Sequence, residues 1–226
     1  LGDFHFDGMA SSEFAQIDSF YTGYGDTAVY FTMRGAFSDT LHQFSLDEYL
    51  VSLEGTDWST SGPVAFALGD GIFHLAHLRL ESEQGSMEVE ANYQRDQVVS
   101  GNLVLNHFDL GLLDPFVENS LPLTGQITAD AIVGGRPDDP VVNLTLNLTD
   151  STFDMAHIDT LHVAASFNQG TLEFQELNLR SEFGQLTGQG QVSHPGAGPK
   201  EYWPGADLDL DLQVTGGKWD FLEQFQ

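Results

Sequence analysis

The chain has 226 residues, of which 34 are acidic and only 7 are Lys or Arg, so its formal net charge is −27. This charge excludes binding to nucleic-acid phosphates, which requires basic side chains, and argues against a flat position on anionic lipid headgroups. There is no cysteine, which excludes disulfides and thiolate metal sites. No apolar run approaches the roughly 18 residues of a membrane span. The chain shows no initiator Met and no signal peptide, so we expect it to be a piece of a longer protein.

Residues 1–72 predict a series of short β-strands. Apolar side chains recur at every second position, and Gly, Ser, Asp and Pro separate the runs as turn formers. The runs are Phe4 and Phe6; Val29, Phe31 and Met33; Phe44 and Leu46; Val51 and Leu53; and Val64, Phe66 and Leu68. The spacing of a long amphipathic helix is missing throughout, and residues 109–118 and 219–226 could form one or two helical turns at most. We therefore predict an all-β chain.

Residues 123–150 predict a β-hairpin. Apolar residues alternate strictly with polar ones from Val142 to Leu148, as in a strand with one apolar and one wet face. The preceding segment alternates in the same way from Ile127 to Val133. Residues 134–140 between them contain Gly, Pro and Asp, which favour a loop.

A repeat then appears at a constant offset: residues 73–87 match residues 172–186, 99 positions later (172 minus 73). Both copies contain the same fault, because the apolar positions change parity between Leu75 and Leu78 and again between Phe174 and Leu177. One extra residue in a strand turns every later side chain to the wrong face unless a β-bulge or corner absorbs it. We therefore expect such an irregularity at both places.

The repeat divides the chain into three segments. Residues 1–72 form a partial β unit, residues 73–171 one unit, and residues 172–226 the start of the next. Leu103 and Leu105 match the later run from Leu208 to Leu212 more loosely. Each unit is expected to bury its apolar face by stacking on its neighbour, as in solenoids, so we expect one continuous β-groove module overall.

The histidines do not predict a metal site. His74 and His77 are three residues apart in a strand, and His157 and His162 are five apart, so we expect each pair to point to opposite faces.

Other chemical motifs are equally weak. Asp207, Asp209 and Asp211 share one strand face but lack the spacing of an EF-hand, so a solvated acidic face is favoured over calcium binding. The nucleophile elbow, the Walker motif and the dinucleotide-binding glycine motif are all missing. We expect no enzymatic activity and no cofactor.

Several motifs, in their order along the chain, resemble the repeat of TamB-type proteins, which belong to the AsmA-like group of bridge-like lipid-transfer proteins. These motifs are Phe108-Asp-Leu-Gly-Leu-Leu, Leu123-Thr-Gly-Gln-Ile, Gly134-Gly, Pro140-Val-Val-Asn-Leu-Thr-Leu and Leu177-Asn-Leu-Arg-Ser-Glu-Phe-Gly-Gln-Leu-Thr-Gly-Gln-Gly. Trp58 with Gly62-Pro-Val-Ala-Phe resembles the same unit one copy earlier. The resemblance covers residues from about 50 to 226, and the extreme acidity departs from it.

The resemblance implies an elongated, antiparallel-rich sheet that curls into an open hydrophobic groove, the β-taco. It also implies a periplasmic location in a Gram-negative envelope, within a parent chain anchored in the inner membrane and reaching an Omp85-family partner in the outer membrane. The implied role is phospholipid transport and outer-membrane biogenesis. The expected ligands are phospholipid acyl chains.

The groove lining predicted for this chain consists of apolar residues from its alternating runs. They are Leu78, Leu80, Leu103, Leu105, Val142, Leu144, Leu146, Leu148, Leu161, Val163, Phe174, Leu177, Leu179, Leu208, Leu210 and Leu212. Two other functions stay open. One is a strand acceptor that assists outer-membrane protein translocation and assembly through an exposed sheet edge. The other is a closed β-sandwich spacer or adhesin-like module whose apolar faces pack on each other.

Overall fold

The computed structural model of the chain describes residues 3–24, 27–53, 55–60, 62–112, 124–153, 156–193 and 207–216. They belong to two compact units, Leu1–Asn106 (unit 1) and His107–Gln226 (unit 2). The described residues are almost entirely β-strand and include no α-helix, which confirms the all-β prediction. Residues 110–112 form a 3-10 turn; the rest of the two predicted helical segments, residues 113–118 and 219–226, lies outside the described residues.

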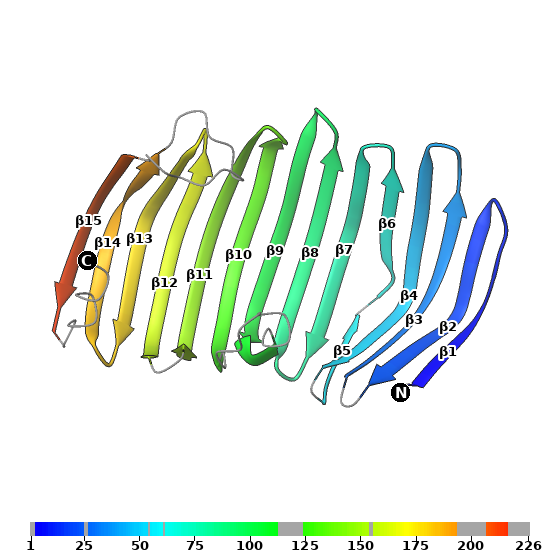
Figure 1. The fold of residues 1–226 in the computed structure, drawn as a ribbon, viewed down its shortest axis with the longest axis horizontal. Coiled ribbons are helices and arrows are strands. Elements are labelled where there is room, and N and C mark those ends of the chain that lie inside the picture. Colours follow the sequence, from blue (N-terminus) through cyan, green and yellow to red (C-terminus); the bar gives the residue numbers. More distant parts are fainter. Residues whose placement is uncertain are drawn as a thin grey trace. The chain divides into compact units, whose positions relative to one another are not determined.

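Unit 1 is an antiparallel sheet in which, with one exception, strands adjacent in the chain pair with each other (Figure 1). Its strands are β1 (Asp3–Ala10), β2 (Phe14–Tyr24), β3 (Thr27–Phe37), β4 (Leu41–Leu53), β5 (Thr56–Thr60), β6 (Val64–Gly69), β7 (Ile72–Ser82), β8 (Gly85–Gln94) and β9 (Val98–Asp109), the last of which continues into unit 2 from His107. Strands β5 and β6 both pair with β4 and β7, so they act as two halves of one interrupted strand.

Unit 2 is an antiparallel meander of six further strands. They are β10 (Thr124–Arg136), β11 (Asp139–Phe153), β12 (Ala156–Asn168), β13 (Thr171–Ser181), β14 (Gly184–Ser193) and β15 (Asp207–Thr215). Each pairs with the next one in the chain. The described strands of each unit therefore make a single layer, whereas a sandwich within one unit would need two.

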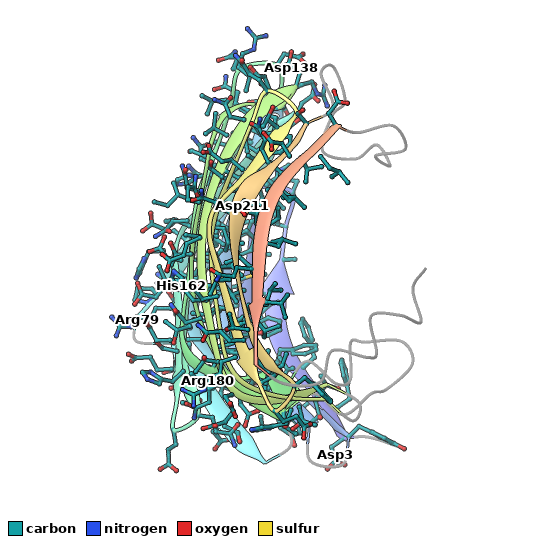
Figure 2. The ribbon with its side chains drawn as sticks, turned by 90° about the vertical axis from the view of Figure 1, so that its left-hand side faces the viewer. Asp3, Arg79, Asp138, His162, Arg180 and Asp211 are labelled. Carbon is teal, nitrogen blue, oxygen red and sulfur yellow. The ribbon has the colours of Figure 1, made fainter. Side chains whose placement is uncertain are left out.

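Alternation of apolar and polar side chains gives the sheet of each unit one apolar and one polar face. In Figure 2 the strands bend along their length, and the polar side chains of Arg79, His162 and Arg180 project from the convex side. Because neighbouring positions along a strand point to opposite faces, the intervening leucines lie on the concave side. The predicted curled sheet is confirmed.

Both irregularities predicted from the repeat are β-bulges. Between Leu75 and Leu78, β7 advances three residues while β8 advances two. Strand β13 does the same against β14 between Phe174 and Leu177. The extra residue keeps the apolar side chains before and after the bulge on one face, and bulges also bend the strand and increase its twist.

The turns that follow the two bulged strands are also alike. The backbone N–H of Gln84 donates to Ser82 Oγ at 3.0 Å, and that of Phe183 donates to Ser181 Oγ at 3.2 Å. Each turn ends on a glycine with positive φ, 138° at Gly85 and 128° in the second copy. The repeat is therefore a structural one, in which β13 and β14 reproduce β7 and β8. The predicted division at residues 73 and 172 falls within one residue of the starts of β7 and β13, and as a domain division it stays a prediction.

The hairpin of β10 and β11 is confirmed, but its loop is shorter than predicted. Pairing continues to Arg136 opposite Asp139, so only Pro137 and Asp138 connect the strands. The prediction of a loop over residues 134–140 was too wide, because Gly and Pro also occur within strand ends, where a missing side chain or N–H is tolerated.

Candidate functional site

The concave face of unit 2 carries four rows of apolar side chains that cross its six strands. The rows are Val133, Val142, Phe167, Leu172, Val192 and Leu208; Ala131, Leu144, Ala165, Phe174, Gly190 and Leu210; Ala129, Leu146, Val163, Leu177, Gly188 and Leu212; and Ile127, Leu148, Leu161, Leu179, Leu186 and Val214. Only two glycines interrupt them, and no charged residue does. We call this surface the unit 2 apolar face.

All of the lining residues predicted within unit 2 lie on this face. They are Val142, Leu144, Leu146, Leu148, Leu161, Val163, Phe174, Leu177, Leu179, Leu208, Leu210 and Leu212. The remaining four, Leu78, Leu80, Leu103 and Leu105, share the apolar face of unit 1, because Val89 pairs with Leu78 and Leu103 while Met87 pairs with Leu80 and Leu105. Their role as a ligand-binding lining stays a prediction.

The prediction missed several residues of the unit 2 apolar face. They are Ile127, Ala129, Ala131, Val133, Ala165, Phe167, Leu172, Leu186, Val192 and Val214. Most of them alternate with polar residues in the same way as the predicted lining residues do, so the period-two alternation could have identified them. In β14 two glycines hide the alternation, because Gly188 and Gly190 occupy apolar-face positions without an apolar side chain.

No second layer packs on this face within the part of unit 2 that the structure describes. On it only Ala129, Leu148 and Ala165 are buried, and most of the other side chains are half-buried. At the edge strand β15 the exposed fraction rises to 69% for Leu208 and 50% for Leu212. Soluble monomers rarely expose contiguous apolar surfaces of this kind without a function.

The two glycines of β14 make room for leucines of β15. A Cβ atom on Gly188 would collide with Leu212 Cδ2 and would lie 2.9 Å from Asp211 O. A Cβ atom on Gly190 would lie 3.0 Å from Leu210 Cδ2. The leucine side chains therefore lie over β14 and continue the apolar face across it.

The apolar face of unit 1 is richer in aromatic rings. Phe20 stacks on Phe31 with ring centroids 4.6 Å apart. Phe20 also makes an edge-to-face contact with Phe4, with centroids 5.6 Å apart. Tyr49 pairs with Phe31 in the ladder, and burial raises the pKa of its phenol above the ordinary value. A second stack joins Phe44 and Phe66 at 4.8 Å. Aromatic contacts of this geometry add packing energy beyond the area that they bury.

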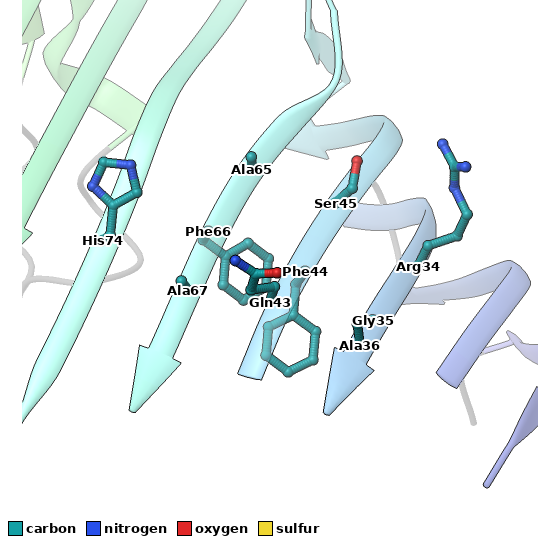
Figure 3. Close-up of a pocket in the computed structure, with 10 residues that line it drawn as sticks. All are labelled: Arg34, Gly35, Ala36, Gln43, Phe44, Ser45, Ala65, Phe66, Ala67 and His74. Atoms are coloured by element: carbon teal, nitrogen blue, oxygen red, sulfur yellow. The ribbon is translucent and has the colours of Figure 1, made fainter. Parts of the chain in front are cut away.

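The polar faces hold most of the charges and a shallow hollow. In unit 1 a depression of about 520 Å³ lies among Arg34, Gln43, Ser45, Ala65 and His74 (Figure 3). Small residues on β3 and β6 create it, and residues such as Phe44 and Phe66 contribute to its floor. It is separate from the rows of leucines, which lie on the other face.

Two predictions about histidine orientation were wrong. The bulge in β7 adds a residue between His74 and His77, so both lie on the polar face: one lines the hollow and the other contacts Glu90 at 3.0 Å. The shift in register between Ile158 and Thr160 has the same effect on His157 and His162. A parity rule fails wherever a bulge intervenes.

These side chains do not assemble a metal centre. Within the described ranges, no three His, Asp or Glu side chains come together as a metal site requires. His162 instead lies 2.7 Å from Asn147 Oδ1 and 3.5 Å from Glu176. Asp207, Asp209 and Asp211 share one face of β15, as predicted, opposite neutral residues of β14.

Arginines on these units are matched to carboxylates. The guanidinium of Arg34 donates two hydrogen bonds to the carboxylate of Asp47, from Nε to Oδ2 at 2.7 Å and from Nη2 to Oδ1 at 2.8 Å. This contact lowers the pKa of the Asp47 carboxyl, chiefly through the hydrogen bond from the guanidinium, and raises the pKa of Arg34.

None of the described segments is a helix with the length and apolarity needed to cross a bilayer. Comparisons with protein-family models, curated proteins and solved structures give no match for this chain. The described residues thus form all-β units whose apolar sheet faces carry no second layer of described strands.

Proposed function

We propose that the apolar faces of the two units bind the acyl chains of phospholipids, and that the chain is a segment of a lipid-transfer conduit. The observation that carries the proposal is the unit 2 apolar face, whose four rows cross six strands with no second layer over them in the described part of the unit. A ligand that is itself a flexible hydrocarbon would cover such a surface without needing specific polar contacts.

The energies are adequate for this task. Burial of hydrocarbon is worth about 0.8 kcal/mol per methylene, so an acyl chain of about 16 carbons gains on the order of 10 kcal/mol. The hydrophobic effect depends on the apolar area buried and not on the orientation of the groups. The binding free energy of an acyl chain is therefore similar at neighbouring positions along the rows. A bound chain can therefore slide along the face, which transport requires.

The wider setting is proposed from the resemblance to TamB-type repeats. It comprises the periplasm of a Gram-negative envelope, an inner-membrane anchor and an Omp85-family partner, both reached through the parent chain, and a role in outer-membrane biogenesis. The open curled sheets support this setting only in that they suit a groove with a hydrocarbon cargo.

A pair of substitutions on adjacent residues of β11 tests the proposal. Leu146 lies on the apolar face and Thr145 on the polar face, opposite Asp130. We expect Leu146→Arg to weaken the binding of a fluorescently labelled phosphatidylcholine, which carries no net charge, by about tenfold or more. The reason is that a guanidinium in the apolar row costs about 1.4 kcal/mol of binding free energy or more. Thr145→Arg should bind as the parent chain does. Equal binding by both folded variants would contradict the assignment of the face.

A strand acceptor is the second candidate, and β15 is the observation that favours it. Among the described strands β15 pairs only with β14, so its other edge presents backbone donors and acceptors. Such an edge can accept an unfolded outer-membrane strand by β-augmentation. Photo-crosslinks from β15 backbone positions to a strand peptide, with no lipid uptake, would favour this candidate over the conduit.

A further inference from the structure

Every arginine that the structure describes has a carboxylate partner. The pairs are Arg34 with Asp47 at 2.7 Å, Arg79 with Glu81 at 2.6 Å, Arg95 with Asp70 at 3.2 Å, Arg136 with Asp138 at 3.3 Å and Arg180 with Asp159 at 3.7 Å. The two lysines, Lys200 and Lys218, lie outside the described residues. The described part of the chain therefore offers no arginine whose charge is unmatched.

The positions of the arginines strengthen this point. Arg79 and Arg180 project from the convex side in Figure 2, away from the apolar rows. Arg95 directly follows β8 and Arg136 is the last residue of β10, so both lie at strand ends, where a headgroup leaves the face if the acyl chains lie along the apolar rows. Their partners there are highly exposed: the side chains of Asp70 and Asp138 are 88% and 74% accessible. The turns thus present carboxylates to solvent beside each cation.

We propose that the apolar faces select phospholipids by headgroup charge, accepting those with no net negative charge and discriminating against anionic ones. This inference rests on the proposed function. A phosphate diester alone needs a cation or a set of donors to compensate its charge. A zwitterionic headgroup with an ammonium carries its own compensation, and its cation is attracted by the surrounding carboxylates.

The whole-chain charge adds to the local effect. A net charge of −27 on 226 residues produces a negative potential over the surface. With a potential of about one to two kT at the headgroup, one extra negative charge on the ligand weakens binding roughly three- to sevenfold. The acyl chains supply the affinity, and the headgroup charge supplies the discrimination.

Competition between lipids with identical acyl chains tests this inference. The chain is incubated with equal amounts of dioleoyl phosphatidylethanolamine and dioleoyl phosphatidylglycerol in the same nonionic micelles, and bound lipids are counted by native mass spectrometry. We expect roughly three- to sevenfold more bound phosphatidylethanolamine than phosphatidylglycerol at about 20 mM salt, with the ratio falling toward one at about 0.5 M, because added ions screen the field. Equal or greater uptake of phosphatidylglycerol at low salt would overturn the selectivity and leave the lipid-binding function standing. Uptake of neither lipid by the folded chain would contradict the function itself.

A matched pair of variants separates the effect of a local unpaired arginine on lipid selectivity from the effect of the net charge. Asp70→Asn removes the partner of Arg95 at a strand-end turn, and Asp47→Asn removes the partner of Arg34 on the polar face. Both change the net charge by one unit. We expect the relative uptake of phosphatidylglycerol to rise roughly twofold or more only in Asp70→Asn, because its freed guanidinium lies where the headgroup emerges. An equal rise in both variants would show that position has no role, and no rise in either would contradict the local part of the inference.

Discussion

Leu212 of β15 lies directly over Gly188 of β14, in the space that a side chain at Gly188 would otherwise fill. The two residues form one step of an apolar row, so the glycine is part of the lining even though it contributes no side chain. The row continues inward through Leu177 and Val163 to Leu146. The edge of the unit 2 apolar face is thus built by a leucine that covers two strands.

Gly188→Ala is expected to weaken the pairing of β14 with β15. The new Cβ would meet Leu212 and the backbone carbonyl of Asp211, so the strands must shift, at a cost of about 1–3 kcal/mol. Amide hydrogen exchange in β15 and denaturant unfolding would measure the loss. Gly134→Ala is the control, since nothing lies within 4 Å of its Cβ. It should be neutral or stabilising by up to about 1 kcal/mol. Equal behaviour of the two variants would contradict the packing described.

Deletion of a bulge residue should be tolerated where deletion of a regular strand residue is not. Gln175 lies within the bulge of β13, so its removal joins Phe174 to Glu176 and leaves a strict alternation with every leucine on the apolar face. The expected cost is about 1 kcal/mol, from the hydrogen bond of its side chain to Ser166 at 2.7 Å. Thermal and denaturant unfolding, followed by circular dichroism, would measure it.

The matching deletion is Thr145, which lies in a regular part of β11. Its removal turns Leu146 and Leu148 to the polar face, and we expect loss of the cooperative unfolding transition of unit 2. If both deletions unfold the chain to the same extent, the residue in β13 is not the dispensable extra one that the register indicates.

The Arg34–Asp47 contact predicts a small dependence of stability on pH. Because the pKa of Asp47 is lowered in the folded chain, the contact contributes stability above the ordinary Asp pKa of about 4. That contribution is lost as the pH falls through the lower folded value. The effect is small because the Arg34 and Asp47 side chains are 68% and 30% accessible.

Asp47→Asn should therefore melt slightly below the parent chain at neutral pH. The difference in melting temperature should shrink as the pH falls below about 4, where the parent also loses the contact. Scanning calorimetry at low protein concentration across this range would measure it, since the sequence pI is about 4.1. A difference that grows with acidification would reverse the sign and contradict the assignment.

The sequence predicted the strands and their faces well because period-two alternation reports directly on a half-buried sheet. It located both bulges, since the parity change between Leu75 and Leu78 recurs 99 residues later. The prediction for His74 and His77 was wrong because it assumed regular alternation between them, whereas the same bulge lies there. The loop of the β10–β11 hairpin was overestimated, since composition does not distinguish a glycine at a strand end from one in a turn.

The arrangement of charges could not be predicted from the chain. Arg95 and Asp70 are 25 positions apart in the sequence (95 minus 70), and the register of β7 with β8, which pairs Ile72 with Gln94, brings their side chains to 3.2 Å. Composition gave the net charge but not the fact that each described arginine is already matched. The openness of the faces was likewise not determined by periodicity, because a closed sandwich has the same alternation.

The proposed function requires that the apolar faces hold phospholipid acyl chains. Native mass spectrometry of the purified chain, before and after incubation with a bacterial lipid extract, tests it most directly when combined with organic extraction of whatever co-purifies. We predict adducts at phospholipid masses on the folded chain, and fewer adducts on Leu146→Arg than on Thr145→Arg. A clean apoprotein mass after incubation, from a sample shown to be folded, would contradict the claim.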